Sequence, residues 1–186
     1  MQCDPDMPES DLIKNAAEGD HAAFRELVRR HESAVANTVF GMLGRCEEAE
    51  DVGQETMVRL YRSLDRFRGE ASVKTYVTRI AINLCVDALR RRKRRSWQFW
   101  RSDDDDEIDI ADPRDTHEDA ERRQGIARAL NTLTPEFRSV VIMRLVHGHS
   151  TDDVADILQI PTGTVLSRLA RAKKQLAKEL EDYIDG

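Results

Sequence analysis

The sequence predicts an all-α protein with two small helical domains joined by a flexible acidic linker. Aromatic side chains make up only 5% of the 186 residues, and glycine and proline are few. Alternating apolar patterns of strand length are scarce, whereas apolar residues recur at helical spacing in both halves of the chain. A dense acidic block separates the halves, so we expect domains at 1–100 and 122–186 with a linker at 101–121.

Two helices are expected first. A short one has Ser10 or Asp11 as its N-cap and stops before Gly19, because serine and aspartate cap helices and glycine ends them. A long one follows at about 22–42 and ends at Gly44. Its apolar residues fall on one stripe: Phe24, Leu27, Val28, Val35, Val39, Phe40 and Leu43.

A third helix, about 48–64, has an apolar face and a polar face. The face expected to point inward carries Val52, Thr56, Leu60 and Leu64. The outward cluster resembles a docking face and consists of Asp51, Gln54, Glu55 and Arg59.

A fourth helix starts near Val73 and runs into an arginine tract. Its inward residues are Val73, Tyr76, Val77, Ile80, Ala81, Leu84 and Ala88. Its polar residues point to other faces and form a second candidate nucleic-acid surface: Lys74, Arg79, Asn83, Asp87, Arg90 and Arg91.

Charge is strongly segregated, although the net charge is only −6. Residues 66–101 hold 11 basic side chains against Glu70 and Asp87, a balance of +9. Residues 102–121 hold 11 acidic side chains against Arg114, a balance of −10. Such an acidic block buries too little apolar surface to fold, so it is expected to be a mobile linker. It serves as a spacer, as a nucleic-acid mimic, or as a mask over the neighbouring basic patch.

Three aromatic residues follow the basic tract: Trp97, Phe99 and Trp100. Aromatic side chains among basic ones stack on single-stranded bases in many proteins. The alternative, which we prefer, is that they pack on their own domain or bind a partner.

Residues 150–174 match a helix-turn-helix. The first helix is apolar on one face, a turn containing Gly163 is expected, and no acidic residue occurs from Pro161 to Lys178. Small hydroxyl residues stand where base edges would lie, and cations follow where phosphates would lie. The candidate DNA contacts are Thr162, Thr164, Ser167, Arg168, Arg171 and Lys174. The alternative is an ordinary solvated basic face.

Other classes of protein fit poorly. No stretch is apolar enough to span a membrane and no signal peptide is evident, so a cytoplasmic protein is expected. The three cysteines are widely separated, which favours reduced thiols over disulfides or zinc. His147 and His149 flank a glycine and are expected on a loop surface, so we predict no metal site and no cofactor. No nucleophile and base come together, which argues against an enzyme.

Three motifs resemble region 2 of bacterial sigma-70-type initiation factors: AEDVGQETMVRLY at 49–61, FRGE at 67–70 and IAINLCVDALRRRKR at 80–94. LTPEFR at 133–138 and PTGTVLSR at 161–168 resemble region 4. With only these two regions, the chain resembles the extracytoplasmic-function (ECF, group IV) sigma factors over about residues 11–180.

The resemblance implies a role for each surface. Asp51, Gln54, Glu55 and Arg59 correspond to the face that docks on the β′ clamp of RNA polymerase, and region 4 is expected at the β flap. Residues 67–75 and the helix after them correspond to the part that melts the minus-10 element, where unstacked bases are captured. The residues implied there are Lys74, Tyr76, Arg79, Asn83, Arg90 and Arg91.

Several positions depart from the family pattern or allow another role. Tyr76 stands where relatives usually carry tryptophan and either packs in the core or contacts DNA; Asn83 pairs with Asp87 or contacts DNA. Leu166 and Ala170 stand where many relatives carry long polar or aromatic side chains. Minus-35 preference is therefore expected to depend more on backbone contacts and DNA shape than on bidentate hydrogen bonds.

The implied partners are core RNA polymerase, promoter DNA and, as in many relatives, an anti-sigma factor, with the free chain a monomer that does not enter a membrane. The alternative function is a stand-alone helix-turn-helix regulator. That reading explains residues 150–174 but leaves the docking face and the fourth helix without a purpose.

Overall fold

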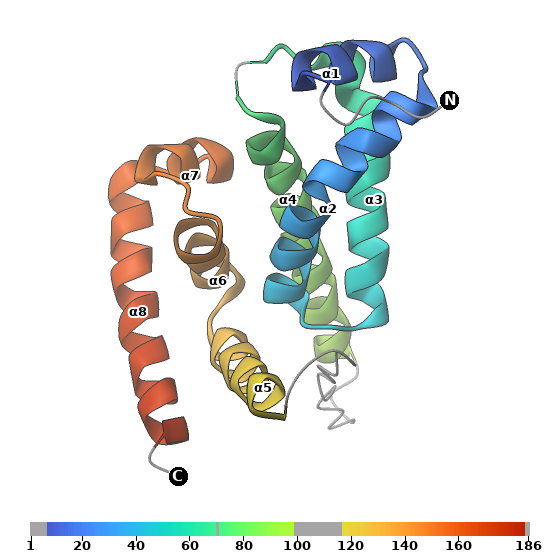
Figure 1. Ribbon diagram of the computed structural model, residues 1–186. Coiled ribbons are helices and arrows are strands. Elements are labelled where there is room, and N and C mark those ends of the chain that lie inside the picture. The colour runs from blue at the N-terminus through green and yellow to red at the C-terminus, as the bar shows by residue number, and fades with distance from the viewer. Residues whose placement is uncertain (1–6, 70, 99–116, 185–186) are drawn as a thin grey trace.

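The computed structural model describes residues 7–69, 71–98 and 117–184, and all regular structure in these ranges is helical (Figure 1). The first domain contains α1 (Glu9–Ala17), α2 (His21–Leu43), α3 (Glu47–Ser63), the 3-10 turn η1 (Leu64–Arg66) and α4 (Val73–Gln98). The second contains α5 (His117–Thr132), α6 (Pro135–Val141), the π-helical turn η2 (Ile142–Val146), α7 (Thr151–Leu158) and α8 (Thr162–Ile184). The predicted all-α class and the four N-terminal helices are confirmed.

The long helix α2 follows its predicted signals. The Asp20 carboxylate accepts hydrogen bonds from the backbone N–H groups of Ala22 (2.7 Å) and Ala23 (3.3 Å), which are left free at a helix start. At the other end Gly44 has a φ of 76° and donates to the Phe40 carbonyl. A left-handed residue after a helix favours glycine, so the sequence signals at both ends are explained.

The start of α1 was predicted wrongly. Neither Ser10 nor Asp11 is the cap, because Pro8 occupies that position and its carbonyl accepts from the backbone N–H groups of Asp11 and Leu12 at 3.1 Å each. Proline lacks an N–H and has its φ fixed near the helical value, so it is readily accommodated where a helix begins.

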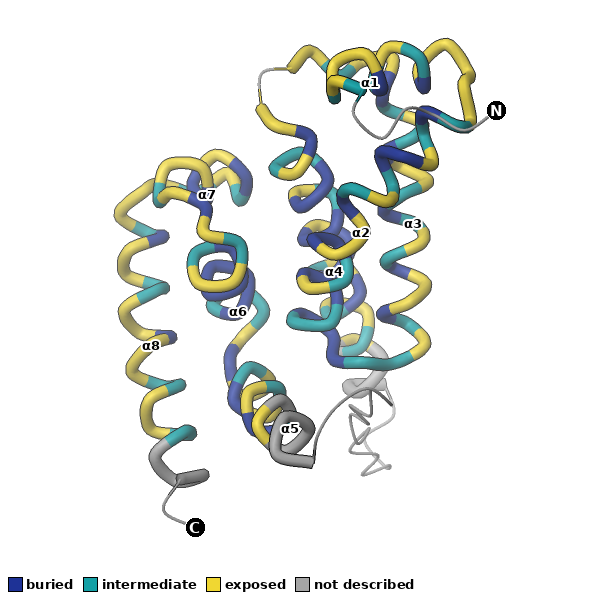
Figure 2. Tube along the Cα trace, in the orientation of Figure 1, coloured by how far each residue is buried: buried dark blue, intermediate teal, exposed yellow. Residues whose placement is uncertain are grey.

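The predicted inward faces of α3 and α4 are largely confirmed. Val52, Thr56, Leu60 and Leu64 are all buried. On α4 most of the predicted inward residues are buried, while Tyr76 and Ile80 are half-buried against the same core. The outward polar residues of both helices are exposed or half-exposed, as Figure 2 shows by the alternation of colours along each helix.

The helix-turn-helix forms with a different turn from the one predicted. A capping box starts α7: the Asp153 backbone N–H donates to Ser150 Oγ, and the Ser150 backbone N–H donates to the Asp153 carboxylate. The turn lies at 159–161, where Gln159 has a φ of 53°. Gly163 is therefore inside α8 and not in the turn, because Pro161 already accepts the first hydrogen bonds of that helix.

The two domains pack against each other. One apolar core includes buried residues of α1 to α4 together with Val140, Ile142, Met143, Val154 and Val165 of the second domain. A smaller cluster is confined to the second domain and centres on Leu133, Val141 and Ala172.

We call the contact of α2 residues 38–42 with residues 138–147 the interdomain seam. Ile142 packs over Gly41, where an added Cβ would lie 2.9 Å from Ile142 Cδ1. Two polar contacts accompany it, Arg138 Nη1 to the Met42 carbonyl (2.5 Å) and Thr38 Oγ1 with His147 Nε2 (2.7 Å).

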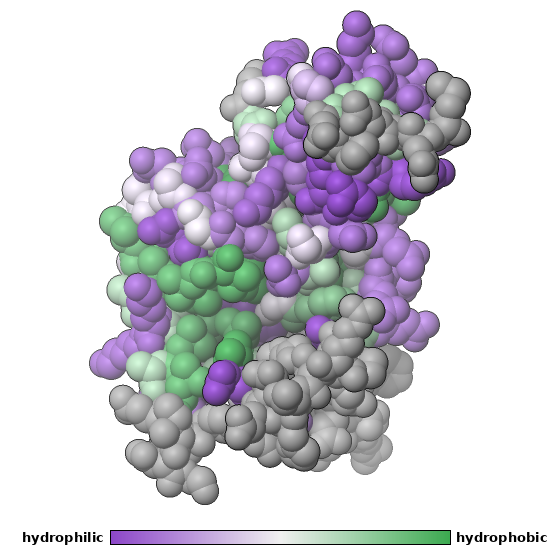
Figure 3. All heavy atoms as spheres, in the orientation of Figure 1, coloured by the Kyte–Doolittle hydropathy of each residue, from purple (hydrophilic) through white to green (hydrophobic). Residues whose placement is uncertain are grey.

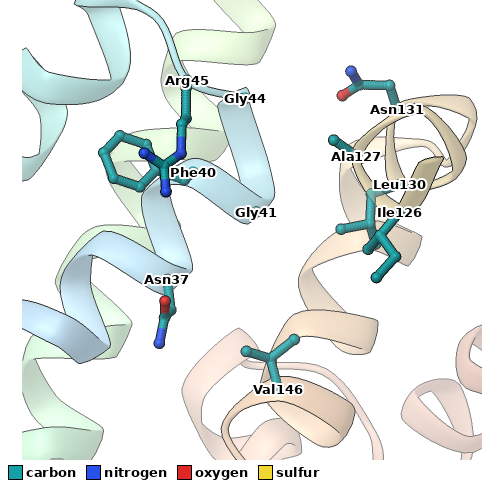
Figure 4. Close-up of a pocket in the computed structure, with 10 residues that line it drawn as sticks. All are labelled: Asn37, Phe40, Gly41, Gly44, Arg45, Ile126, Ala127, Leu130, Asn131 and Val146. Atoms are coloured by element: carbon teal, nitrogen blue, oxygen red, sulfur yellow. The ribbon is translucent and has the colours of Figure 1, made fainter. Parts of the chain in front are cut away.

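Beside the seam is a pocket of about 360 Å³ between α2 and α5. In Figure 4 Asn37, Phe40 and Arg45 face Ile126, Leu130 and Val146 across this space. The Arg45 guanidinium lies over the Phe40 ring, 5.1 Å from its centre. The space between α2 and α5 is therefore less closely packed than the seam.

The linker prediction lies mostly outside the described residues, which exclude 99–116. α5 begins at His117, inside the range 101–121 assigned to the linker. Phe99 and Trp100 also lie outside the described residues, as does the side chain of Trp97.

Candidate polymerase and nucleic-acid interfaces

The predicted docking face forms one exposed surface on α3. Asp51 and Gln54 are exposed, Glu55 is half-exposed, and Arg59 lies one turn further on. Arg59 Nε donates to the Glu55 carboxylate at 2.8 Å across a single helical turn. This internal pair compensates part of the negative charge, so Asp51 is the uncompensated acidic group of the four.

Four of the six predicted minus-10 residues share one stripe of α4. Tyr76, Arg79, Asn83 and Arg90 are three, four and seven residues apart, which places them on the same side of a helix of 3.6 residues per turn. Asp87 lies within this stripe, and its carboxylate is 3.8 Å from Arg90 Nη1. Asn83, Arg79 and Arg90 are exposed, so three polar groups of this stripe are available to a partner.

Lys74 and Arg91 do not join that stripe. Lys74 is close enough to His147 and His149 of the second domain to lower the pKa of both imidazoles. Arg91 lies toward α3, where its Nη2 is 3.8 Å from the Glu48 carboxylate. The structure therefore separates the six residues into one stripe and two flanking cations.

Tyr76 packs on its neighbours. It is half-buried, and its ring meets the Phe67 ring edge-on with the centres 5.1 Å apart. This contact holds the loop before α4 against the start of the helix. The packing role left open from sequence is present, and a DNA contact by the exposed part of the ring stays a prediction.

The neighbouring Arg92 has a structural role that the sequence did not suggest. Its Nε donates to the Glu48 carboxylate at 2.5 Å and its Nη2 lies 3.0 Å from Cys46 Sγ. This joins the start of α3 to the C-terminal half of α4. Cys85 is buried nearby, and burial with the Glu48 charge raises the pKa of its thiol to about 12, which keeps it unreactive.

The predicted minus-35 residues lie on α8. Thr164, Ser167, Arg168, Arg171 and Lys174 fall on neighbouring positions of its outward side, with Thr164 and Arg168 half-buried and the others exposed. Thr162 lies apart on the other flank, where its hydroxyl is 3.3 Å from an Asp152 carboxylate oxygen of α7. In Figure 1 α8 and α3 are at opposite edges of the molecule, so the DNA-type and docking-type faces are well separated.

His147 and His149 were predicted to lie on a loop surface, and this is wrong. Gly148 does make the turn, with a φ of 73°, but His149 is buried and His147 is half-buried at the interdomain seam. Burial, His149 and Lys74 lower the pKa of His147 to about 4. Burial is also the main cause that lowers the pKa of His149. Both imidazoles are therefore neutral at pH 7.

Arg138 was also missed as a structural residue. Its side chain is 6% exposed, and the guanidinium donates to three backbone carbonyls, those of Met42, Asn131 and Leu133. Burial, with a smaller effect of Arg92, lowers its pKa to about 10, so it stays charged at pH 7. Apolar spacing did not mark this role, because the carbonyls that Arg138 binds belong to α2 and to the end of α5.

Surface hydropathy, possible metal ligands and helix hydropathy bear on whether the chain could bind a metal or enter a membrane. Figure 3 shows apolar side chains gathered over the second domain, while the first domain is mostly polar on this face. Within 7–69, 71–98 and 117–184 no cluster of three or more His, Cys, Asp or Glu side chains is arranged to bind a metal. None of the helices in these ranges has the length and hydropathy needed to cross a bilayer.

An all-α chain with a helix-turn-helix and a second cationic helix has the features of a DNA-binding protein. The comparisons with known proteins identify the family. Residues 27–95 match the family model "Sigma-70 region 2", and residues 123–176 match "Sigma-70, region 4".

Whole-chain relatives agree. The ECF RNA polymerase sigma-E factor of Escherichia coli (strain K12) is 30% identical over 185 residues, which cover 93% of this chain and 94% of the relative. The ECF RNA polymerase sigma factor SigW of Bacillus subtilis (strain 168) is 29% identical over 178 residues, covering 91% and 95%. The chain therefore belongs to the ECF sigma factors of the sigma-70 family and directs transcription.

Solved structures share the fold. A structure of CnrH in complex with the cytosolic domain of CnrY matches with a TM-score of 0.65 and 24% identity, covering 94% of this chain and 97% of the other. A sigma factor RpoE in complex with the anti-sigma factor NepR from Bartonella quintana matches with a TM-score of 0.69 and 23% identity, covering 85% and 96%. Because the family consists of initiation factors, the chain is not an enzyme.

Proposed function

We propose that this sigma factor binds core RNA polymerase through α3, opens the minus-10 element with α4 and holds the minus-35 element with α8. The observation that supports this most is the separation of the three surfaces. An acid-rich face, a cationic stripe and a basic helix lie on different helices, so one partner on each leaves the others accessible.

For the polymerase contact we propose the β′ clamp as the partner of Asp51, Gln54, Glu55 and Arg59, with the β flap contacting the second domain. An exposed acidic face suits a basic partner surface, and such complementarity raises association rates. Asp51→Lys is expected to reduce core binding about tenfold or more, because it puts a positive charge in place of the uncompensated acid of the face. Glu32→Lys, on the exposed side of α2, is the matched control.

At the minus-10 element, Arg79, Asn83 and Arg90 are proposed to contact the separated strand, with Tyr76 and Lys74 beside them and Arg91 at the edge. Cations hold phosphates, and an amide hydrogen-bonds a base edge. Unstacking a base costs a few kcal/mol, and capture of that base by protein groups offsets it. Arg79 and Asn83 are one turn apart, so they reach adjacent parts of one strand.

At the minus-35 element, Ser167, Arg168, Arg171 and Lys174 are proposed to hold the duplex together with Thr164 and Thr162. Cationic side chains contribute most of the salt-dependent affinity, whereas base edges determine sequence preference. Arg171→Ala and Lys174→Ala are each expected to weaken promoter binding by a similar factor on every promoter and to reduce its dependence on salt.

We further propose that the two domains separate when polymerase binds. The minus-10 and minus-35 elements are centred about 25 base pairs apart, or about 85 Å of duplex at a rise of 3.4 Å per base pair. A compact chain of this length has a radius of gyration of about 16 Å. The closed arrangement is too short to reach both elements, so the linker, proposed at 101–121 between domains 1–100 and 122–186, must let them part.

An anti-sigma factor is a further proposed partner. The solved relatives include complexes whose titles name the anti-sigma factor NepR and the cytosolic domain of CnrY. We propose that the free chain is a cytoplasmic monomer, since the cytoplasm contains the polymerase and the promoters. We also propose that an anti-sigma factor binds the free chain and keeps it from the polymerase until the factor is released.

The decisive experiment is transcription in vitro with core polymerase on a genomic library, followed by mapping of the start sites. The sigma factor should produce a discrete set of starts that share sequence near minus 10 and minus 35. Asp51→Lys should abolish them and Glu32→Lys should retain them. Specific duplex binding at nanomolar Kd by the chain without polymerase would favour a stand-alone regulator instead.

A further inference from the structure

The recognition helix α8 exposes a large apolar side chain at its outward side. Leu166 is 54% exposed, whereas Val165 and Ala172 on the inward side are fully buried. Leu166 is one turn after the start of α8, the part of a helix-turn-helix recognition helix that approaches base edges. An exposed leucine side chain at this position contributes little to the packing of the chain itself.

The surrounding positions are small. At 100° per residue, Gly163, Ser167 and Ala170 lie next to Leu166 on the outward side, and all are exposed. A Cβ added to Gly163 would meet nothing within 4 Å, so packing within the chain does not require a glycine there. Small side chains instead allow a duplex to approach the first two turns of α8 closely, with Leu166 as the longest exposed group on this flank there.

The two arginines occupy the other flank. Arg168 and Arg171 lie on the opposite side of Ser167 from Leu166, so the first turns of α8 divide into a cationic part and an apolar part. Two turns further on, Lys173 lies on the flank of Leu166 and Lys174 lies at the centre of the outward side. A helix set in the major groove has such cations at the phosphates of one strand while its other flank faces bases.

Leucine has no hydrogen-bonding group, so it cannot distinguish the donors and acceptors of base edges. The only apolar group that a base presents in the major groove is the C5 methyl of thymine. We propose that Leu166 packs against a thymine methyl in the minus-35 element and is a specificity-determining residue of this sigma factor. Ala170, one turn further on, supports the same contact. This inference rests on the proposed role of α8 at the minus-35 element.

The test removes the methyl from the DNA rather than the side chain from the protein. A promoter found by start-site mapping is prepared with each minus-35 thymine replaced in turn by deoxyuridine, which lacks only the C5 methyl. Binding of the complete polymerase holoenzyme is measured by competition. At one position the replacement should weaken binding about threefold to fivefold, as expected for one methyl group removed from an apolar contact.

Variants complete the test. In Leu166→Ala holoenzyme thymine and deoxyuridine should bind equally at that position, and Leu166→Arg should shift the preferred base toward guanine. The matched control is Leu145→Ala, which removes an equally exposed leucine on η2 and should keep the thymine preference. Circular dichroism checks that each variant folds.

The proposal is overturned if wild-type holoenzyme binds equally well after each thymine is replaced by deoxyuridine, or if the minus-35 element contains no thymine. It is also overturned if Leu166→Ala holoenzyme still binds thymine more tightly than deoxyuridine at that position. None of these results affects the proposed function, which fails instead if no promoter is transcribed. The wild-type measurement needs no variant, so a folding defect cannot obscure it.

Discussion

Arg138 shows how much a single buried charge contributes to this fold. Its guanidinium reaches the end of α2 and the end of α5 at once, donating to Met42 at 2.5 Å, Asn131 at 3.0 Å and Leu133 at 3.2 Å. These carbonyls lie at or just after helix C-termini, where acceptors lack partners and a cation is favoured by the helix dipole.

Arg138→Met is therefore expected to lower the free energy of unfolding by about 2 kcal/mol, because three backbone acceptors lose a charged donor while some desolvation of the guanidinium is relieved. Urea unfolding followed by circular dichroism measures the loss. Arg128→Met, an exposed arginine on α5, is the control and should change stability little. Equal stability of the two variants would contradict this role.

Among the elements, α7 depends on its first turn because it has only eight residues. The capping box of Ser150 and Asp153 satisfies backbone groups that a helix start leaves free. Ser150→Ala is expected to lower the free energy of unfolding by about 1 kcal/mol. Since α7 packs on α8, promoter affinity of the holoenzyme should fall with it.

The control is Thr151→Ala, which changes the next residue. The Thr151 side chain makes no hydrogen bond within the part of the chain that the structure describes. Thermal unfolding of both variants decides the point. If Thr151→Ala is as destabilising as Ser150→Ala, the cap is not what stabilises α7.

The four N-terminal helices and the helix-turn-helix pair could be predicted from sequence, because each has an apolar stripe of the right period. The helices α5 and α6 were not predicted, and the first residues of α5 fall in the range assigned to the linker. Gly44 ends α2 as expected. The turn before α8 was misplaced, because a left-handed residue is usually glycine and here it is Gln159. The exposed residues of α3, α4 and α8 could be predicted from the same apolar stripes, because the side of a helix opposite its buried face points to solvent.

The contact between the domains could not be predicted. Periodicity says which face of a helix is buried and not what covers it. Nothing in the sequence indicates that Gly41 packs against Ile142 of the other domain. The buried positions of Arg138 and His147 depend on the same contact, so both were missed.

The seam holds the two domains in a closed form, which we propose opens when polymerase binds. Gly41→Gln is expected to separate the domains, because the new side chain occupies the space of Ile142 while glutamine favours the helix. Small-angle scattering should show a larger radius of gyration than the wild-type chain. Gly53→Gln on α3 is the matched control, since an added Cβ there meets nothing within 4 Å. An unchanged radius for Gly41→Gln would show that the seam is not what keeps the domains together.

The seam should also respond to pH through His147. Its pKa is about 4 when the domains touch and returns toward 6.5 when they part, so protonation favours the open form. The closed form is fully stable above pH 6.5 and loses stability as the pH falls below it. From pH 7.5 to pH 5.5 the ratio of closed to open chains should fall about fivefold to tenfold.

The groups around His147 support that sign. Lys74 of α4 and His149 add positive charge beside it, and burial disfavours the charged His149 as well. Asp153 is the opposing carboxylate near His149, and its Oδ2 already accepts hydrogen bonds from the backbone N–H and the hydroxyl of Ser150. A second positive charge at the seam therefore has little compensation, and separating the domains restores its hydration.

Energy transfer between dyes on α3 and α8 of the free chain measures the opening, with far-UV circular dichroism confirming that the helices persist at pH 5.5. His147→Gln keeps an N–H to donate to Thr38 and cannot titrate, so most of the pH response should disappear. His21→Gln changes an exposed histidine on α2 and should leave the response intact. A response that survives replacement of both His147 and His149 by glutamine would mean that other groups open the molecule.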